Sequence, residues 1–250
     1  PALARFHTTL ATFNQNETYF ERDEVKRIYI YLQNFCIDQI NRSQPAFFRE
    51  LFGLYRDQLE REFLHENGYL VEWHYKNVAT TAIRLGEMAW AEQFIETQKA
   101  ALEPDSRETA YCLSKATYYD ALGQHDEVLR YLLRVEYRDP RYSLGAKILQ
   151  LRSYYELEEW EPLHALVESF RHYLKRNSLL ADSRRKGYYD LFRLTRRLAQ
   201  LRAQMGYQST EKIRAGITKL RADLQAVETM PKRDWLVAKL EALEREVAVK

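Results

Sequence analysis

A short pattern occurs twice near the middle of the chain, and it constrains the fold more than any other feature. The first copy reads RLGEMAWAEQFIE from Arg84, and the second reads ALGQHDEVLRYLL from Ala121. The glycines of the two copies, Gly86 and Gly123, lie 37 residues apart. Self-similarity at a period of this size is the signature of a repeat architecture.

Each copy predicts two helices joined by a glycine turn. Apolar residues recur at helical spacing in residues 75–85, and a second apolar stripe follows Gly86. Glycine ends the first helix because it enters the left-handed C-cap conformation without a Cβ clash. Pro104 and Pro140 are expected to end the second helices. One hairpin cannot bury both of its faces, so neighbouring hairpins must stack.

This pattern resembles the tetratricopeptide repeat (TPR), a unit of about 34 residues with a glycine between two helices and a proline after the second. Gly123 and Pro140 occupy those positions, and a third, weaker copy spans residues 146–177 with Glu158 in place of the turn glycine. The chain is also similar to bacterial TPR proteins without an assigned function. The resemblance implies an all-α fold, an α-solenoid of antiparallel helical hairpins wound into a right-handed superhelix.

Three regions follow from this interpretation. Residues 1–68 are expected to form longer helical hairpins ending at Asn67-Gly68, and residues 69–180 three degenerate repeats. Residues 181–250 are expected to form capping helices, with a mobile tail as the alternative. The chain should contain ten to twelve helices and no sheet. Residues expected between neighbouring hairpins are Phe94, Tyr119, Leu132 and Leu163.

Cysteine use and hydropathy bear on location. Cys36 and Cys112 fall in predicted helices far apart in the sequence, which favours buried free thiols in a reducing compartment, and hence a cytoplasmic protein. No apolar run approaches the roughly 20 residues that span a bilayer, and no signal peptide is visible. Because the sequence begins at Pro1 without a methionine, a piece of a longer repeat protein is one expectation.

Charge is concentrated in residues 169–205, which hold ten basic and two acidic residues, whereas residues 1–168 carry a net charge of −8. One interpretation is a basic ridge that binds nucleic acid, an anionic membrane or an acidic partner. The other is a solvated face, or a mate for the acidic region in the same chain or in a homo-oligomer. The spacing of Tyr188, Tyr189 and Phe192 predicts core positions. The ridge comprises Arg171, Lys175, Arg176, Arg184, Arg185, Lys186, Arg193, Arg196 and Arg197.

Motifs for catalysis are absent from the sequence. It contains no glycine-rich phosphate loop, HExxH, paired CxxC or GxSxG. Two ExxH pairs occur, Glu62 with His65 and Glu161 with His164, but a di-iron bundle also needs two further inward glutamates in the same core. We therefore expect no enzymatic activity, cofactor or metal site.

The resemblance also implies a partner groove, because the first helix of each TPR hairpin lines the concave side. The corresponding positions are Trp73, Lys76, Asn77, Thr80, Arg84, Thr117, Asp120, Arg152 and Tyr155. They combine aromatic anchors with hydrogen-bond donors, as a peptide binder requires. Lys76, Arg84 and Arg152 should then share one surface. The alternative is that the aromatic members are core and the basic members are solvated.

The leading hypothesis is a non-catalytic protein–protein interaction scaffold that binds a partner segment in this groove. The alternative is a protein associated with nucleic acid, or with an acidic partner, through the basic ridge. The partner itself is not identified by any residue pattern.

Overall fold

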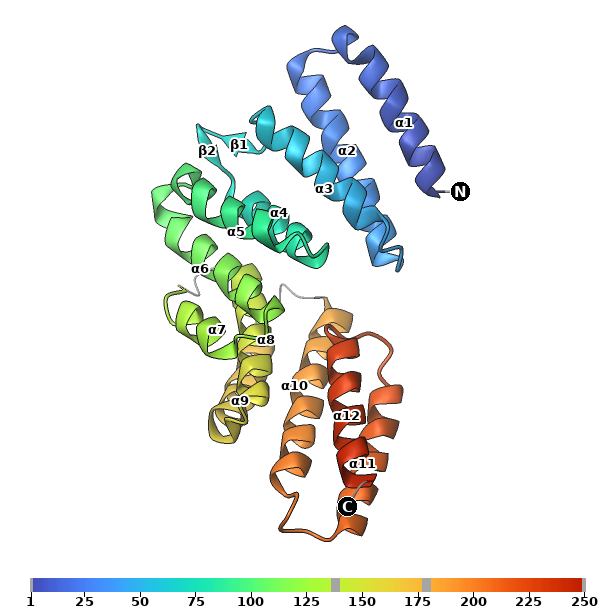
Figure 1. The fold of residues 1–250 in the computed structure, drawn as a ribbon, viewed down its shortest axis with the longest axis vertical. Helices are drawn as coiled ribbons and strands as arrows, with labels where there is room; N and C mark the ends of the chain where they lie inside the picture. The colour runs from blue at the N-terminus through green and yellow to red at the C-terminus, as the bar shows by residue number, and fades with distance from the viewer. Residues whose placement is uncertain (1, 136–139, 177–180, 249–250) are drawn as a thin grey trace. The chain divides into compact units, whose positions relative to one another are not determined.

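The structure, a computed structural model, describes residues 2–135, 140–176 and 181–248. Within these ranges the chain is all-α, as predicted, with twelve α-helices, two 3-10 turns and one short β-ribbon (Figure 1). The helices are α1 (Ala2–Asn16), α2 (Arg22–Asn41), α3 (Phe47–Glu60), α4 (Glu72–Arg84), α5 (Met88–Thr97), α6 (Pro104–Ala121), α7 (His125–Leu132), α8 (Pro140–Glu156), α9 (Trp160–Arg176), α10 (Asp182–Ala203), α11 (Thr210–Gln225) and α12 (Arg233–Ala248).

The helices form two compact units, Pro1–Ala121 and Leu122–Lys250, and each is described by itself. The boundary falls inside the region 69–180 that was expected to hold the three repeats. A superhelix running through both units therefore stays a prediction.

In the first unit, consecutive helices from α2 to α6 pack against one another, and α4 also packs against α6. Helix α1 is attached through aromatic rings. Phe6 stacks on Phe35 at 6.1 Å between ring centroids and meets Phe47 edge-on at 5.9 Å. Phe13 likewise meets Tyr29 edge-on at 5.8 Å. Such wide side chains join helices whose backbones remain well separated.

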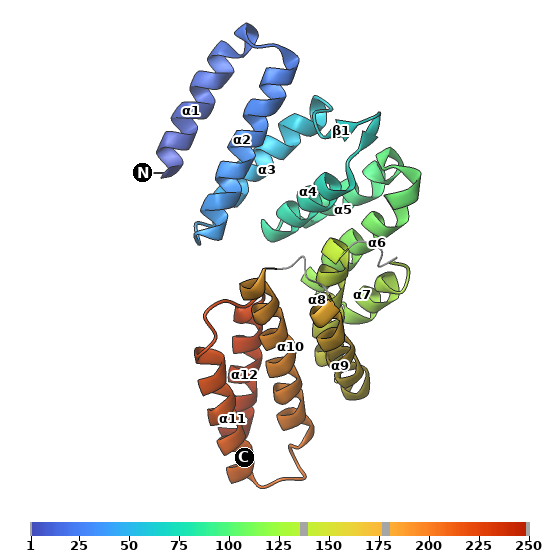
Figure 2. The ribbon, with the colours of Figure 1, turned by 180° about the vertical axis from the view of Figure 1, so that it is seen from behind.

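In the second unit, helices α8 to α12 share one apolar core. Helices α10, α11 and α12 lie side by side (Figure 2). Phe170 of α9 and Phe192 of α10 stack with centroids 3.8 Å apart. Apolar residues of α11 and α12, among them Ile217 and Leu240, are buried in this core. Ser209 caps α11, and its side chain accepts a hydrogen bond from the backbone N–H of Lys212.

The three predicted inter-helix turns share one backbone conformation. Gly86 and Gly123 have φ of 78° and 71°, and Glu158 has φ of 58°. Glutamate therefore adopts the left-handed conformation that glycine adopts in the other two turns, although its Cβ makes this costly. The third copy thus forms the expected turn without the expected glycine.

The hydrogen bonds of the first and third turns also match. The backbone N–H of Glu87 donates to the carbonyl of Ala82 at 3.0 Å, and that of Glu159 donates to Tyr154 at 2.8 Å. Each bond reaches back five residues, as in the Schellman motif that ends many helices. The turns that recur in the sequence therefore also share their backbone conformation.

The prediction that no sheet forms was wrong at Asn67-Gly68. These residues connect two short antiparallel strands, β1 (His65–Glu66) and β2 (Tyr69–Leu70). Asn67 and Gly68 have φ of 51° and 83°, and two consecutive left-handed residues make the type I′ turn that favours β-hairpins. Helix α3 accordingly ends at Glu60, before the expected point.

Two further expectations need correction. Pro104 and Pro140 begin α6 and α8 instead of ending the preceding helices, because proline lacks an N–H that the first helical turn would leave unpaired.

Tyr119 is only half-buried, and the Lys115 ammonium lies 5.1 Å from its ring centroid. The other three residues expected between hairpins are buried, and so are both free cysteines, as predicted.

Candidate binding groove along α9 and α10

The predicted partner-groove residues of α4 lie on one helical face. Trp73, Lys76, Asn77, Thr80 and Arg84 follow one another at helical spacing, and none of them is fully buried. The Trp73 side chain is 46% exposed. The Arg84 guanidinium lies 5.3 Å from the centroid of the Phe48 ring, so it contacts α3 while remaining exposed.

The remaining predicted groove residues have other surroundings. Thr117 and Asp120 are half-buried on α6 of the first unit. In the second unit, the Arg152 guanidinium lies 5.4 Å from the Trp235 ring, and Tyr155 is buried edge-on against the same ring. Tyr155 is therefore a core residue. Since Arg152 belongs to a different unit from the α4 residues, the predicted common surface stays a prediction.

The predicted basic ridge divides into two parts. The C-terminal part is paired with carboxylates of the same unit, and of these Glu168 belongs to the acidic region 1–168. The ion pairs are Arg193 with Asp190 at 3.0 Å, Arg196 with Glu168, and Arg197 with Asp223. These pairs occupy the three guanidinium groups, and those at the surface contribute little to stability.

The N-terminal part of the ridge is mostly uncompensated. Arg185 pairs with Asp182, three residues earlier on α10. No ion pair joins Arg171, Lys175, Arg176, Arg184 or Lys186 to another residue in the described part of the chain. All five are exposed. Their charges therefore add to a local positive potential that would attract an anion.

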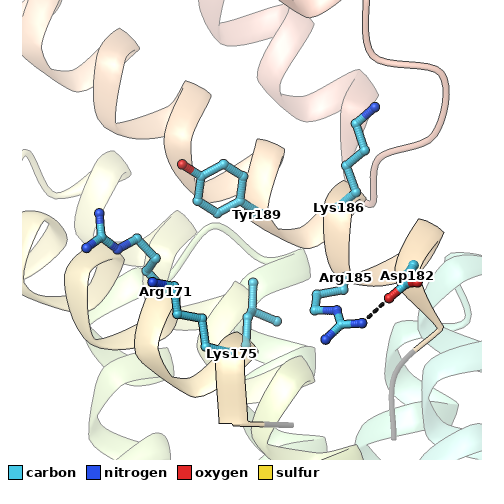
Figure 3. Close-up of a pocket in the computed structure, with 7 residues that line it drawn as sticks. Arg171, Lys175, Asp182, Arg185, Lys186 and Tyr189 are labelled. Atoms are coloured by element: carbon cyan, nitrogen blue, oxygen red, sulfur yellow. Dashed lines mark hydrogen bonds and ion pairs between the residues drawn. The ribbon is translucent and has the colours of Figure 1, made fainter. Parts of the chain in front are cut away.

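Most of these cations surround a pocket of about 620 Å³ between the end of α9 and the start of α10 (Figure 3). Leu174, which is buried, supplies an apolar surface, and the ring of Tyr189 forms part of one wall. The remaining lining residues are Arg171, Lys175, Asp182, Arg185 and Lys186. The pocket thus combines four basic side chains with a single carboxylate.

A smaller cavity of about 80 Å³ continues along the same pair of helices and shares Arg171 and Tyr189 with the first. Its other lining residues are Val167, Glu168, Phe170, Phe192, Arg193 and Arg196. We call the two cavities together the α9–α10 groove. It has an apolar floor from the core of the unit and a charged rim.

Tyr189 was expected to be a core residue, and this expectation was wrong. Its side chain is 41% exposed, whereas Phe192 is buried and Tyr188 is half-buried. Tyr189 precedes Arg193 by four residues and Arg196 by seven, so it shares their face of α10. The spacing of Tyr189 from the two arginines is visible in the sequence and could have predicted its exposed position.

The chemistry of the α9–α10 groove is that of anion binding. Its lining residues include six basic side chains and two carboxylates, Asp182 and Glu168, so positive charge is in excess. Elsewhere in residues 2–135, 140–176 and 181–248, no group of three or more His, Cys, Asp or Glu side chains could hold a metal ion. Across those same ranges, the helices are too short or too polar to cross a membrane.

Comparisons with models of protein families, with curated proteins and with solved structures gave no match. The groove and the all-α fold therefore carry the functional argument.

Proposed function

We propose that the protein is a non-catalytic interaction scaffold that binds a segment of a partner protein, and that the α9–α10 groove is a binding site. The observation that carries the proposal is a set of cations, Arg171, Lys175 and Lys186, that have no ion-pair partner in the described part of the chain and that line a pocket with an apolar floor. Stacked helical hairpins of the TPR-like kind offer extended surfaces for such segments. We also propose that the fold is a TPR-like solenoid and that the protein acts in the cytoplasm. The exposed Trp73 face of α4 is proposed as a second contact region.

Nucleic-acid binding through the same groove is the second candidate, and the exposure of Tyr189 favours it. Proteins that bind single strands place aromatic rings among cations so that bases can stack. Tyr189 is, however, the one exposed aromatic residue among those that line the groove. A single ring over an apolar, helix-walled groove suits a peptide side chain better than a run of bases.

Selection from a library of displayed random peptides tests the proposal. The wild-type chain serves as bait, and a variant with Lys175→Glu and Lys186→Glu serves for counter-selection. A matched control carries Lys212→Glu and Lys219→Glu, two exposed lysines of α11. We expect peptides that bind the wild type and the control but not the groove variant.

Two results would contradict the proposal. One is the recovery of no peptide above background. The other is a set of peptides that bind the wild type and the groove variant equally, together with salt-dependent retention of the wild type on single-stranded DNA.

A further inference from the structure

We infer that the segment bound in the α9–α10 groove is acidic and carries an apolar side chain next to its acidic residues. This inference rests on the proposed function and names the chemical class of the partner. It commits to an extended segment of another protein, and the charge of the groove is the feature that selects it.

The cations are distributed along the pocket. Arg171 and Lys175 lie one turn apart on α9, and Arg185 and Lys186 belong to the first turns of α10. Figure 3 shows these side chains around the pocket, pointing in different directions instead of converging on one point. A lone phosphate is held by donors that converge on it. Separated cations instead suit a ligand with several negative charges along its length.

An apolar contact lies among these charges. The Leu174 side chain is part of the buried core yet lines the pocket, and the exposed ring of Tyr189 borders both cavities. A tyrosine ring supplies large contact area and loses little side-chain entropy when it is held. The occupant therefore needs an apolar side chain at this point, which an amphipathic peptide provides.

The two ends of the groove differ in how their cations are paired. At one end, Lys175 and Lys186 have no ion-pair partner among the described residues, and Arg185 pairs only with the exposed Asp182. At the other end, Arg193 and Arg196 are already paired with Asp190 and Glu168. A carboxylate gains most where no internal carboxylate competes with it. The acidic residues of the segment should therefore lie at the first end, and its apolar residue near Tyr189.

Asp182 is the one acidic residue that lines the larger pocket. Its side chain is 92% exposed and pairs with Arg185. This carboxylate competes with the ligand for Arg185 and repels other carboxylates. Replacing it should strengthen the binding of an acidic segment, which is the opposite of the effect expected for the neighbouring lysines.

Fluorescence anisotropy of the whole chain tests the inference. The probe is a labelled peptide in which glutamates flank one phenylalanine, and its comparison peptide has glutamines in place of the glutamates. Combining Lys175→Gln with Lys186→Gln should weaken binding of the acidic peptide about tenfold, and Asp182→Asn should strengthen it about threefold. Lys212→Gln with Lys219→Gln is the matched control and should leave the affinity unchanged. Thermal melts establish that each variant is folded.

Several outcomes would overturn the inference. These are equal binding of the glutamine peptide, weakening by Asp182→Asn, full displacement of the peptide by inorganic phosphate or single-stranded DNA, and self-association of the chain that the groove variant abolishes. If displayed peptides bind at the groove but are not acidic, the partner class proposed here is wrong while the proposed function stands. If no peptide of any composition binds there, both fail.

Discussion

Individual residues show where this chain departs from its own repeat. Glu158 holds the left-handed conformation that Gly86 and Gly123 hold in the other two turns. Its side chain forms an ion pair with Arg202 at 2.7 Å. A side chain in this conformation costs about 1 kcal/mol or more relative to glycine, and the exposed ion pair offsets only part of that cost.

We therefore predict that the variant with Glu158→Gly is more stable than the variant with Glu158→Ala by about 1 kcal/mol. Both changes remove the ion pair, so the difference reports the backbone alone. Urea unfolding followed by circular dichroism measures it. Equal stabilities of the two variants would show that residue 158 is not left-handed in solution.

His74 makes stability depend on pH. Burial lowers the pKa of its imidazole from 6.5 to about 4, because the charged form loses water. Below pH 6.5 the unfolded chain takes up a proton that the folded chain does not. The stability that the chain gains from a neutral His74 is therefore fully present above pH 6.5, and it decreases as the pH falls toward 4.

The His74 contribution to the free energy of unfolding should fall by about 2 kcal/mol between about pH 7 and about pH 5. The variant with His74→Phe should lack this part of the pH dependence, whereas His7→Phe, at an exposed position, should retain it. Denaturant titrations at the two pH values provide the test. Parallel profiles for the wild type and the His74 variant would contradict the assignment.

At the scale of helices, periodicity in the sequence predicted most elements, because apolar stripes at helical spacing follow directly from the buried faces. The β-ribbon at Asn67-Gly68 was missed because the same dipeptide suits a helix end and a hairpin turn. The partners of Arg196 and Arg197 lie 28 and 26 residues away on other helices. Such pairs could not be predicted before the helix packing was known, so the ridge could not be divided into its paired and unpaired parts.

Close packing around α10 gives a prediction at this scale. A Cβ on Gly187 would lie 2.7 Å from the backbone oxygen of Thr229, whereas a Cβ on Gly145 of α8 would meet nothing within 4 Å. Gly187→Ala should therefore destabilise the protein by about 1–3 kcal/mol. Gly145→Ala should stabilise the protein by about 0.5–1 kcal/mol, because a glycine in a helix interior loses more conformational entropy on folding than an alanine does. Thermal unfolding of both variants is the measurement, and a shift of the same sign for both would contradict the packing described.

At the scale of the whole molecule, we place the acidic segment on the second unit and keep the α4 face of the first unit as a second contact region. The sequence located the excess of positive charge correctly but placed the leading partner groove elsewhere, on positions taken from the repeat resemblance. Of those positions, Tyr155 is buried in the core, while Trp73 remains exposed on α4. The α9–α10 groove and the α4 face are thus separable sites for an experiment.

Hydrogen–deuterium exchange with and without the acidic peptide tests the central claim most directly. The account predicts slower exchange of amides in residues 160–176 and 182–203, with little change in residues 72–84. Protection should disappear in the variant with Lys175→Gln and Lys186→Gln and persist in the variant with Lys212→Gln and Lys219→Gln. Protection confined to α4, or protection of α9 and α10 that survives the groove changes, would contradict it.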